Sequence, residues 1–176
     1  MRAPVLGIAG WSGSGKTALL EYVLPRLSSQ GLRINVIKHT HHEPSSEDRS
    51  KDSFRLYAAG AARVLVASSS RGREPDLDKL LCCQSATDLI LVEGFKNAPI
   101  PKLEIYRPGL GEPALYPHDS HVIAVATDSP PPRIVRQRLI WLDIQKPAQV
   151  LSWIQLYIGM QMCEMQMRPV QQAVIL

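Results

Sequence analysis

The chain is poor in aromatic residues and in cysteine, and it has no long hydrophobic run. Aromatic residues make up 6% of the 176 residues, and the three cysteines are Cys82, Cys83 and Cys163. Three cysteines, two of them adjacent, do not make a disulfide framework, so we expect a reducing, cytoplasmic environment. The longest apolar stretch near the C-terminus, residues 150–162, is interrupted by polar side chains. It falls short of the ~20 apolar residues that a membrane span needs, so we expect no membrane association.

The chain also lacks a strong excess of either charge. It has 20 Lys and Arg against 16 Asp and Glu, which gives a formal net charge of +4. This small surplus favours anionic partners, but no basic patch interleaved with aromatic residues accompanies it, so we expect no nucleic acid as a partner. Because 45% of the residues are apolar, the chain can bury a core of single-domain size. Phosphate groups on a small molecule are the anions we expect it to bind.

Short apolar runs rich in β-branched residues alternate with helical patterns along the chain. This alternation is typical of βαβ units and predicts a three-layer α/β fold, a mostly parallel sheet flanked by helices. Strands are predicted at residues 5–9, 34–38, 63–67, 88–92, 102–106, 122–126 and 140–142, and helices at residues 17–29, 51–59, 76–81 and 147–158.

Two segments depart from this alternation. Residues 103–116 are predicted to form a β-hairpin extension, whose apolar residues would be better covered by a second copy, so we expect a homodimer. Residues 159–176 hold four of the five methionines and several glutamines. We therefore divide the chain into a domain of residues 1–158 and a Met- and Gln-rich C-terminal tail of residues 159–176, which is either a weakly specified helix or an adaptable contact surface.

The most specific motif lies between the first predicted strand and the first predicted helix. It reads Gly10-Trp11-Ser12-Gly13-Ser14-Gly15-Lys16-Thr17 and matches G-x-x-x-x-G-K-[ST], the P-loop. Its glycines let successive backbone N–H groups approach phosphate oxygens closely. Lys16 is expected to reach the β- and γ-phosphates as a catalytic charge, and the Thr17 hydroxyl to bind Mg²⁺. All eight residues therefore form a predicted nucleotide-binding loop.

Further candidate residues follow other predicted strands, at the edge of the sheet where ligands of open α/β folds collect. Glu93 follows the strand 88–92 and is expected near Mg²⁺ or the attacking water, unless it is a solvated strand-end residue. Asp52 opens a predicted helix and either approaches Mg²⁺ or caps the helix. Asp128 follows the strand 122–126 and can accept hydrogen bonds from N1–H and N2–H₂ of guanine, although the usual Asn-Lys-x-Asp pattern is absent.

The segment Lys38-His39-Thr40-His41-His42 concentrates basic and imidazole groups after the second predicted strand. We expect Lys38 and His39 to face the phosphates, while a transition-metal site formed by the histidines is the alternative. Four lysines, namely Lys16, Lys38, Lys51 and Lys96, are expected at the same end of the sheet. The sequence places no arginine beside the P-loop, so we expect slow hydrolysis of the nucleotide.

Taken together, these blocks resemble the family of molybdopterin-guanine dinucleotide biosynthesis adapter proteins, MobB. The resemblance is carried by residues 9–17, 37–42, 51–53, 58–61, 88–96 and 122–128, in the order that the family has them. It implies a P-loop GTP-binding homodimer with bound Mg²⁺ and weak GTPase activity. Such a protein assists the guanylyltransferase that attaches GMP to molybdopterin.

The resemblance also implies roles for individual residues. Thr17, Asp52 and Glu93 would lie near the metal, and Lys38, His39, Lys51 and Lys96 would form a surface for molybdopterin, its guanine dinucleotide or the partner enzyme. Two other functions stay open on the residues alone. One is a small-molecule kinase whose lid carries arginines, drawn from Arg71, Arg73, Arg133, Arg136 and Arg138. The other is a metallochaperone-type GTPase that uses His39, His41 and His42.

Overall fold

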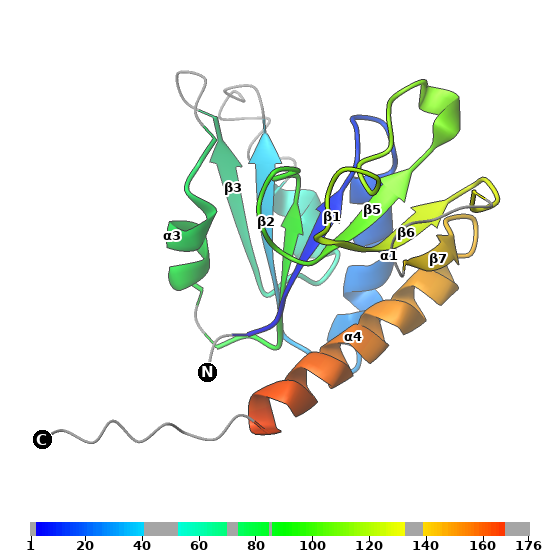
Figure 1. Ribbon diagram of the computed structural model, residues 1–176. Helices are drawn as coiled ribbons and strands as arrows, with labels where there is room; N and C mark the ends of the chain where they lie inside the picture. The colour runs from blue at the N-terminus through cyan, green and yellow to red at the C-terminus, as the bar shows by residue number, and fades with distance from the viewer. Residues whose placement is uncertain (1–2, 41–52, 70–73, 85, 133–138, 168–176) are drawn as a thin grey trace, which may run out of the picture.

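The computed structural model describes residues 3–40, 53–69, 74–84, 86–132 and 139–167. Seven strands form one sheet in the order β3-β2-β4-β1-β5-β6-β7, and every strand pair is parallel (Figure 1). The strands are β1 (Val5–Ala9), β2 (Ile34–Thr40), β3 (Arg63–Ser68), β4 (Leu89–Glu93), β5 (Lys102–Tyr106), β6 (Val122–Thr127) and β7 (Ile140–Asp143). The seven predicted strands are confirmed to within two residues at each end.

Helices cover both faces of the sheet, which gives the predicted three layers. The described helices are α1 (Lys16–Ser28), α3 (Leu77–Cys82) and α4 (Pro147–Met167), the short 3-10 helix η1 (Pro108–Leu110), and a helical segment at residues 53–58. One apolar core joins α1, α4 and Leu56 of the 53–58 segment to the sheet, and a second core joins α3 to β2, β4 and Phe95. In Figure 1, α3 lies beside β3 at one edge of the sheet. Helix α4 starts near β7 at the other edge and runs diagonally toward the amino ends of the strands.

The first predicted helix, residues 17–29, is confirmed to within one residue at each end, because α1 runs through Pro25 to Ser28. The end of the last predicted helix needs correction. The last helix does not stop at Ile158, because α4 runs on without interruption to Met167. Methionine and glutamine are good helix formers, so nothing in this composition ends the helix at Ile158. Within the described part of the chain, no helix is long and apolar enough to cross a membrane.

The predicted β-hairpin at residues 103–116 is wrong. Its first residues belong to β5, which lies inside the sheet and pairs in parallel with both β1 and β6. The alternation of polar and apolar residues in β5 is typical of a half-exposed strand, but Lys102 and Glu104 are buried here. Lys102 forms an ion pair with Asp119, and Glu104 accepts hydrogen bonds from the backbone of the segment that follows η1. The apolar residues of β5 are therefore covered by this chain itself.

The position of β1 in the sheet decides where a ligand can bind. The chain passes from β1 to β2 and β3 on one side, returns to β4 beside β1, and then builds β5, β6 and β7 on the other side. The strand order thus reverses at β1, and the carboxyl ends of β4, β1 and β5 lie side by side. In open α/β sheets this switch point is where ligands bind.

The long helix α4 packs on the sheet through its apolar face, and a side chain in its third turn adds a hydrogen bond to β1. The Tyr157 hydroxyl donates to the Val5 carbonyl at 2.8 Å, at the amino end of β1. Burial raises the pKa of Tyr157 to about 12. Because this exceeds the value near 10 of an unfolded tyrosine, Tyr157 stabilises the fold below pH 10 and loses that contribution as the pH rises from 10 to 12.

We predict that Tyr157→Phe lowers the free energy of unfolding by about 1 kcal/mol at pH 7, since the Val5 carbonyl loses a donor. Denaturant melts of both proteins from pH 7 to pH 11.5 measure the difference. The difference should shrink above pH 10, because only the wild type has a Tyr157 proton to lose. A constant difference across this range would contradict the assignment of that proton to the Val5 hydrogen bond.

Candidate functional site

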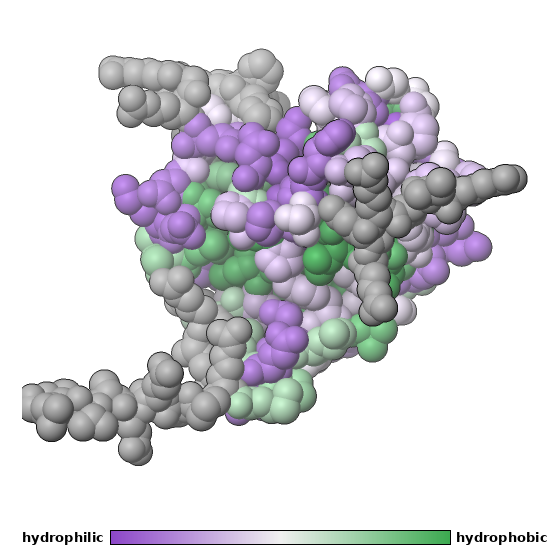
Figure 2. Space-filling view, viewed as in Figure 1, coloured by the Kyte–Doolittle hydropathy of each residue, from purple (hydrophilic) through white to green (hydrophobic). Residues whose placement is uncertain are grey.

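A cavity of about 690 Å³ opens at the carboxyl ends of β1, β2 and β4. The P-loop forms one wall, and the ends of β2 and β4 with the residues after β4 form the other. Figure 2 shows hydrophilic residues gathered at the end of the molecule where β2 and β3 finish in Figure 1. Three of the four predicted lysines line this cavity, namely Lys16, Lys38 and Lys96. The fourth, Lys51, lies outside the described residues.

The P-loop packs directly on the neighbouring strand β5. Gly10 has a φ of 139°, and a Cβ at this position would lie 2.5 Å from the Ile105 carbonyl oxygen. Gly13 and Gly15 also have positive φ angles, and Ser14 is buried beneath the turn. Only glycine allows this close approach between the loop and the backbone of β5.

Lys16 extends along the inside of the loop. Its Nζ donates to the carbonyl oxygens of Gly10 at 3.0 Å and Trp11 at 2.8 Å. Burial lowers the pKa of Lys16, and the neighbouring Lys96 and Lys38 lower it further, while Glu93 opposes the change. The ammonium group is thus held by exchangeable bonds to two carbonyls, in a cavity where a negatively charged ligand would stabilise its charge.

Glu93 joins three elements at the base of the cavity. Its Oε1 accepts a hydrogen bond of 2.8 Å from the Thr17 hydroxyl at the start of α1, and its Oε2 lies 3.7 Å from Lys38 Nζ on β2. This Oε2 is buried and accepts no hydrogen bond within the described part of the chain. A hydroxyl and a carboxylate with an unused lone pair are oxygen ligands of the kind Mg²⁺ prefers, so these two residues fit the predicted metal.

Trp11 connects the P-loop to two other segments. Its indole Nε1 donates to the Pro113 carbonyl at 2.7 Å, and Lys96 Nζ lies 3.5 Å from the centre of its ring. A cation at this distance over a tryptophan face is attracted by the ring quadrupole. Lys96 therefore stands at the rim of the cavity, stacked on the loop that is predicted to hold phosphate.

His39 lies inside the protein and not on its surface. It stacks on Phe95 with the ring centroids 4.7 Å apart, its Nε2 lies 2.9 Å from Ser69 Oγ, and its Nδ1 lies 3.8 Å from Glu74 Oε1. Lys38 is also largely buried, with a side chain that is 11% exposed. Both residues line the cavity from within β2, so they can contact a ligand there but do not form an outer partner surface.

Arg107 is a site residue that the sequence reasoning missed. It directly follows β5, and its guanidinium Nε donates to the Ser14 carbonyl in the P-loop at 2.9 Å. Its Nη1 forms an ion pair of 2.9 Å with Asp128 Oδ2 after β6. The expectation that no arginine lies beside the P-loop is therefore wrong. The sequence held one signal for it, since Arg107 follows the predicted strand 102–106 just as Glu93 and Asp128 follow theirs.

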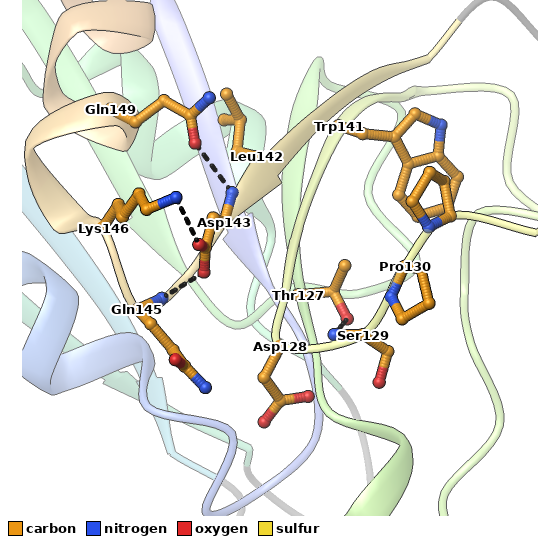
Figure 3. Close-up of a pocket in the computed structure, with 11 residues that line it drawn as sticks. Thr127, Asp128, Ser129, Pro130, Trp141, Leu142, Asp143, Gln145, Lys146 and Gln149 are labelled. Carbon is orange, nitrogen blue, oxygen red and sulfur yellow. Dashed lines mark hydrogen bonds and ion pairs between the residues drawn. The ribbon is translucent and has the colours of Figure 1, made fainter.

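A second cavity, of about 410 Å³, lies at the carboxyl ends of β6 and β7 (Figure 3). Thr127 and Asp128 form one side, and Asp143, Lys146 and Gln149 form the other. Asp143 pairs with Lys146 at 3.3 Å and accepts from the Gln145 backbone at 2.9 Å. In Figure 3 the carboxylate of Asp128 points away from this pair. The predicted base-reading residue thus lines a cavity of its own, two strands from the P-loop.

Some of the predicted site residues belong to segments that the structure does not describe. Asp52, His41 and His42 lie outside the described residues, as do five arginines considered for a kinase lid, namely Arg71, Arg73, Arg133, Arg136 and Arg138. Among the residues that the structure does describe, no three His, Cys, Asp or Glu side chains gather as a metal site would require.

Comparison with known proteins gives one consistent result. The family described as MobB, molybdopterin guanine dinucleotide synthesis protein B, matches residues 5–128. A "Molybdopterin-guanine dinucleotide biosynthesis adapter protein" of Haemophilus influenzae is 40% identical over 161 residues, which are 86% of this chain and 88% of that protein. A protein of the same description from Escherichia coli is 44% identical over 139 residues, 72% of this chain and 79% of its own length.

Solved structures agree with the sequence comparison. The crystal structure of Bacillus subtilis MobB has a TM-score of 0.59 at 27% identity and covers 87% of this chain and 96% of that one. A MobB protein homolog from Bacillus stearothermophilus also has a TM-score of 0.59, at 21% identity, with 89% of this chain and 98% of that chain covered. At that lower identity the likeness concerns the fold alone.

We predict that Gly10→Ala lowers the free energy of unfolding by about 1–3 kcal/mol, because a Cβ at this backbone angle meets the Ile105 carbonyl. Gly109→Ala is the matched control, since Gly109 has open space around it and should change stability by less than about 0.5 kcal/mol. Denaturant melts of the two variants measure the contrast. Equal stability of the two variants would show that the loop does not pack on β5 as described.

Proposed function

Because the chain belongs to the family of molybdopterin guanine dinucleotide synthesis protein B, we propose that it is a GTP-binding adapter in the synthesis of that dinucleotide. The observation that carries this proposal is the arrangement of two cavities along one edge of the sheet. One is lined by the P-loop and three lysines, and the other by Asp128. A nucleoside triphosphate has the same division into a polyphosphate and a base.

The triphosphate is assigned to the cavity at the ends of β1, β2 and β4. Lys16 would exchange its bonds to the Gly10 and Trp11 carbonyls for phosphate oxygens, and the start of α1 would add its positive dipole end. Lys38 and Lys96 supply further positive charge within the same cavity. The eight residues from Gly10 to Thr17 are the proposed phosphate cradle.

Mg²⁺ is assigned to Thr17 and Glu93, whose oxygens already lie 2.8 Å apart. When bound, the ion would neutralise part of the charge on the β- and γ-phosphates. Asp52 is retained as a third proposed contributor on the family resemblance alone. Glu93 also holds Thr17 and Lys38 in place, and its Oε2 is the group we assign to orient a water molecule for slow hydrolysis.

The guanine base is assigned to the cavity beside Asp128. Adjacent strands lie ~4.8 Å apart, so the end of β6 is about 10 Å along the edge from the end of β1, a separation that an extended nucleotide can bridge. A carboxylate can accept both N1–H and N2–H₂ of guanine, and adenine lacks this pair of donors. Asp128 is therefore the proposed basis for choosing GTP over ATP.

The proposed partners are the molybdopterin guanylyltransferase, molybdopterin or its guanine dinucleotide, and a second copy of this chain, in the cytoplasm. For partner contact, Lys96 remains the candidate among the described lysines, because Lys38 lies deeper in the cavity. The homodimer is supported by α4. Leu156, Met160 and Met167 are 67%, 63% and 71% exposed, and their spacing places them on one stripe of that helix.

We predict that Lys16→Ala lowers the affinity for GTP and ATP alike by at least ~10-fold, since a charge-assisted hydrogen bond to phosphate is lost. Asp128→Ala should instead lower the ratio of GTP to ATP affinity by ~10-fold or more and leave ATP binding nearly unchanged. Isothermal titration with and without EDTA measures both ratios and the contribution of Mg²⁺. Unchanged triphosphate affinity in Lys16→Ala would refute the phosphate site. An unchanged ratio of GTP to ATP affinity in Asp128→Ala would refute the base site.

We predict that the wild-type protein is a dimer at micromolar concentration and that Leu156→Glu combined with Met160→Glu makes it a monomer, because charges on the apolar stripe cannot be buried unpaired. Light scattering measures the mass. Gln166→Glu is the control, since this exposed position lies on another side of the same helix. A monomeric wild type, or a double variant that stays dimeric, would count against α4 as the dimer surface.

A further inference from the structure

Arg107 lies between the two proposed halves of the nucleotide site. The strand that precedes it, β5, is paired with β1 on one side and β6 on the other. Its end therefore lies between the P-loop, which follows β1, and Asp128, which follows β6. Among the described residues, Arg107 is the side chain that touches both, at 2.9 Å to Ser14 and 2.9 Å to Asp128.

The bond to Ser14 acts on the orientation of one peptide group in the cradle. A trans peptide holds its C=O and N–H on opposite sides. When Arg107 Nε holds the Ser14 carbonyl, the N–H of Gly15 in the same peptide points away from Arg107. Gly15 has a φ of 102° and lines the phosphate cavity. Because glycine leaves the Ser14–Gly15 peptide free to rotate, the bond from Arg107 fixes the direction of its N–H group.

The bond to Asp128 acts on the base site. The carboxylate is 26% exposed and accepts from Arg107 Nη1 through Oδ2. One carboxylate oxygen has two lone pairs, so Oδ2 can keep this bond while the carboxylate accepts from a base. The planar guanidinium joins Nε and Nη1 rigidly, so the direction of Asp128 and the direction of the Ser14–Gly15 peptide are set by one group.

We propose that Arg107 is a positioning residue that couples the phosphate cradle to base selection, by fixing the Ser14–Gly15 peptide and the Asp128 carboxylate through the same guanidinium. This inference rests on the proposed function, because it assumes that phosphate and base bind at the two cavities. It assigns Arg107 no contact with the reacting phosphate. Its effect on base choice passes entirely through Asp128.

The substitution Arg107→Lys separates geometry from charge. It keeps the positive charge but replaces the planar fork by a single ammonium group, which cannot hold Ser14 and Asp128 together in one plane. Arg63→Lys is the matched control. Arg63 stands at the opposite end of the sheet, at the start of β3, and donates to the Cys83 carbonyl.

The experiment measures binding of inorganic tripolyphosphate, GTP and ATP by isothermal titration to the wild type, Arg107→Lys and Arg63→Lys. Tripolyphosphate carries no base and so reports on the cradle alone. We expect Arg107→Lys to weaken tripolyphosphate binding ~3- to 10-fold and to lower the ratio of GTP to ATP affinity by a similar factor. Arg63→Lys should change neither. Thermal unfolding of each variant confirms that the fold is retained.

A double-mutant cycle tests whether Arg107 influences the choice between GTP and ATP through Asp128. Adding Arg107→Lys to Asp128→Ala should leave the GTP to ATP ratio of Asp128→Ala unchanged, while tripolyphosphate binding still weakens. If the wild type binds all three ligands and Arg107→Lys binds them equally well, this inference is overturned and the proposed function stays intact. Wild-type protein that binds neither GTP nor tripolyphosphate would refute both. A further loss of the ratio in the double variant would overturn the route through Asp128, because Arg107 would then read the base by itself.

Discussion

The pairing of β1 with both β4 and β5 is the constraint on which the rest of this molecule depends. Its register sets Ile8 beside Glu93 and Ala9 beside Glu104, so the three strands end at nearly the same level. The P-loop, Glu93 and Arg107 each lie at the end of one of these strands. The site residues therefore reach one another directly from neighbouring strand ends. Backbone hydrogen bonds of the parallel sheet hold those strand ends in place.

Buried charges hold the site together, and each has partners that offset the cost of removing it from water. Glu93 accepts from Thr17 and lies near Lys38, so one carboxylate ties α1 and β2 to β4. Glu104 accepts from the backbone N–H groups of Leu115 and Tyr116, although burial still raises its pKa. The segment that Glu104 holds carries the Pro113 carbonyl, which in turn receives the Trp11 indole. The buried Glu104 of β5 thus helps to hold the segment to which Trp11 of the P-loop is hydrogen-bonded.

Two ends of the molecule differ in character. At the carboxyl ends of the strands, polar and charged groups surround two cavities, while the last turns of α4 carry the exposed Met160, Met162 and Met167. The strand ends thus present polar groups around cavities, and the last turns of α4 present apolar side chains.

Much of this architecture was readable from local sequence. The P-loop depends on glycines and a Lys-Thr pair that are contiguous in the chain, and the strands on apolar runs of the right length, so both were located correctly. Glu93 and Asp128 were placed at the right edge for the same reason, because each lies at the end of such a run. Lys16, Lys38 and Lys96 were predicted to share one end of the sheet, and they line one cavity.

Only the tertiary structure decided how residues far apart in the chain meet. Arg107 touches Ser14 across 93 positions, and Trp11 meets Pro113 across 102, and neither pair has a sequence pattern that marks it. The alternating polarity of β5 is typical of a half-exposed strand, and only the fold supplies the partners of the buried Lys102 and Glu104, which are Asp119 and the backbone N–H groups of Leu115 and Tyr116. Sequence thus determined which segments carry the phosphate-binding pattern, since that chemistry is local. Packing determined which side chains join the two cavities, because such contacts depend on strand order and register.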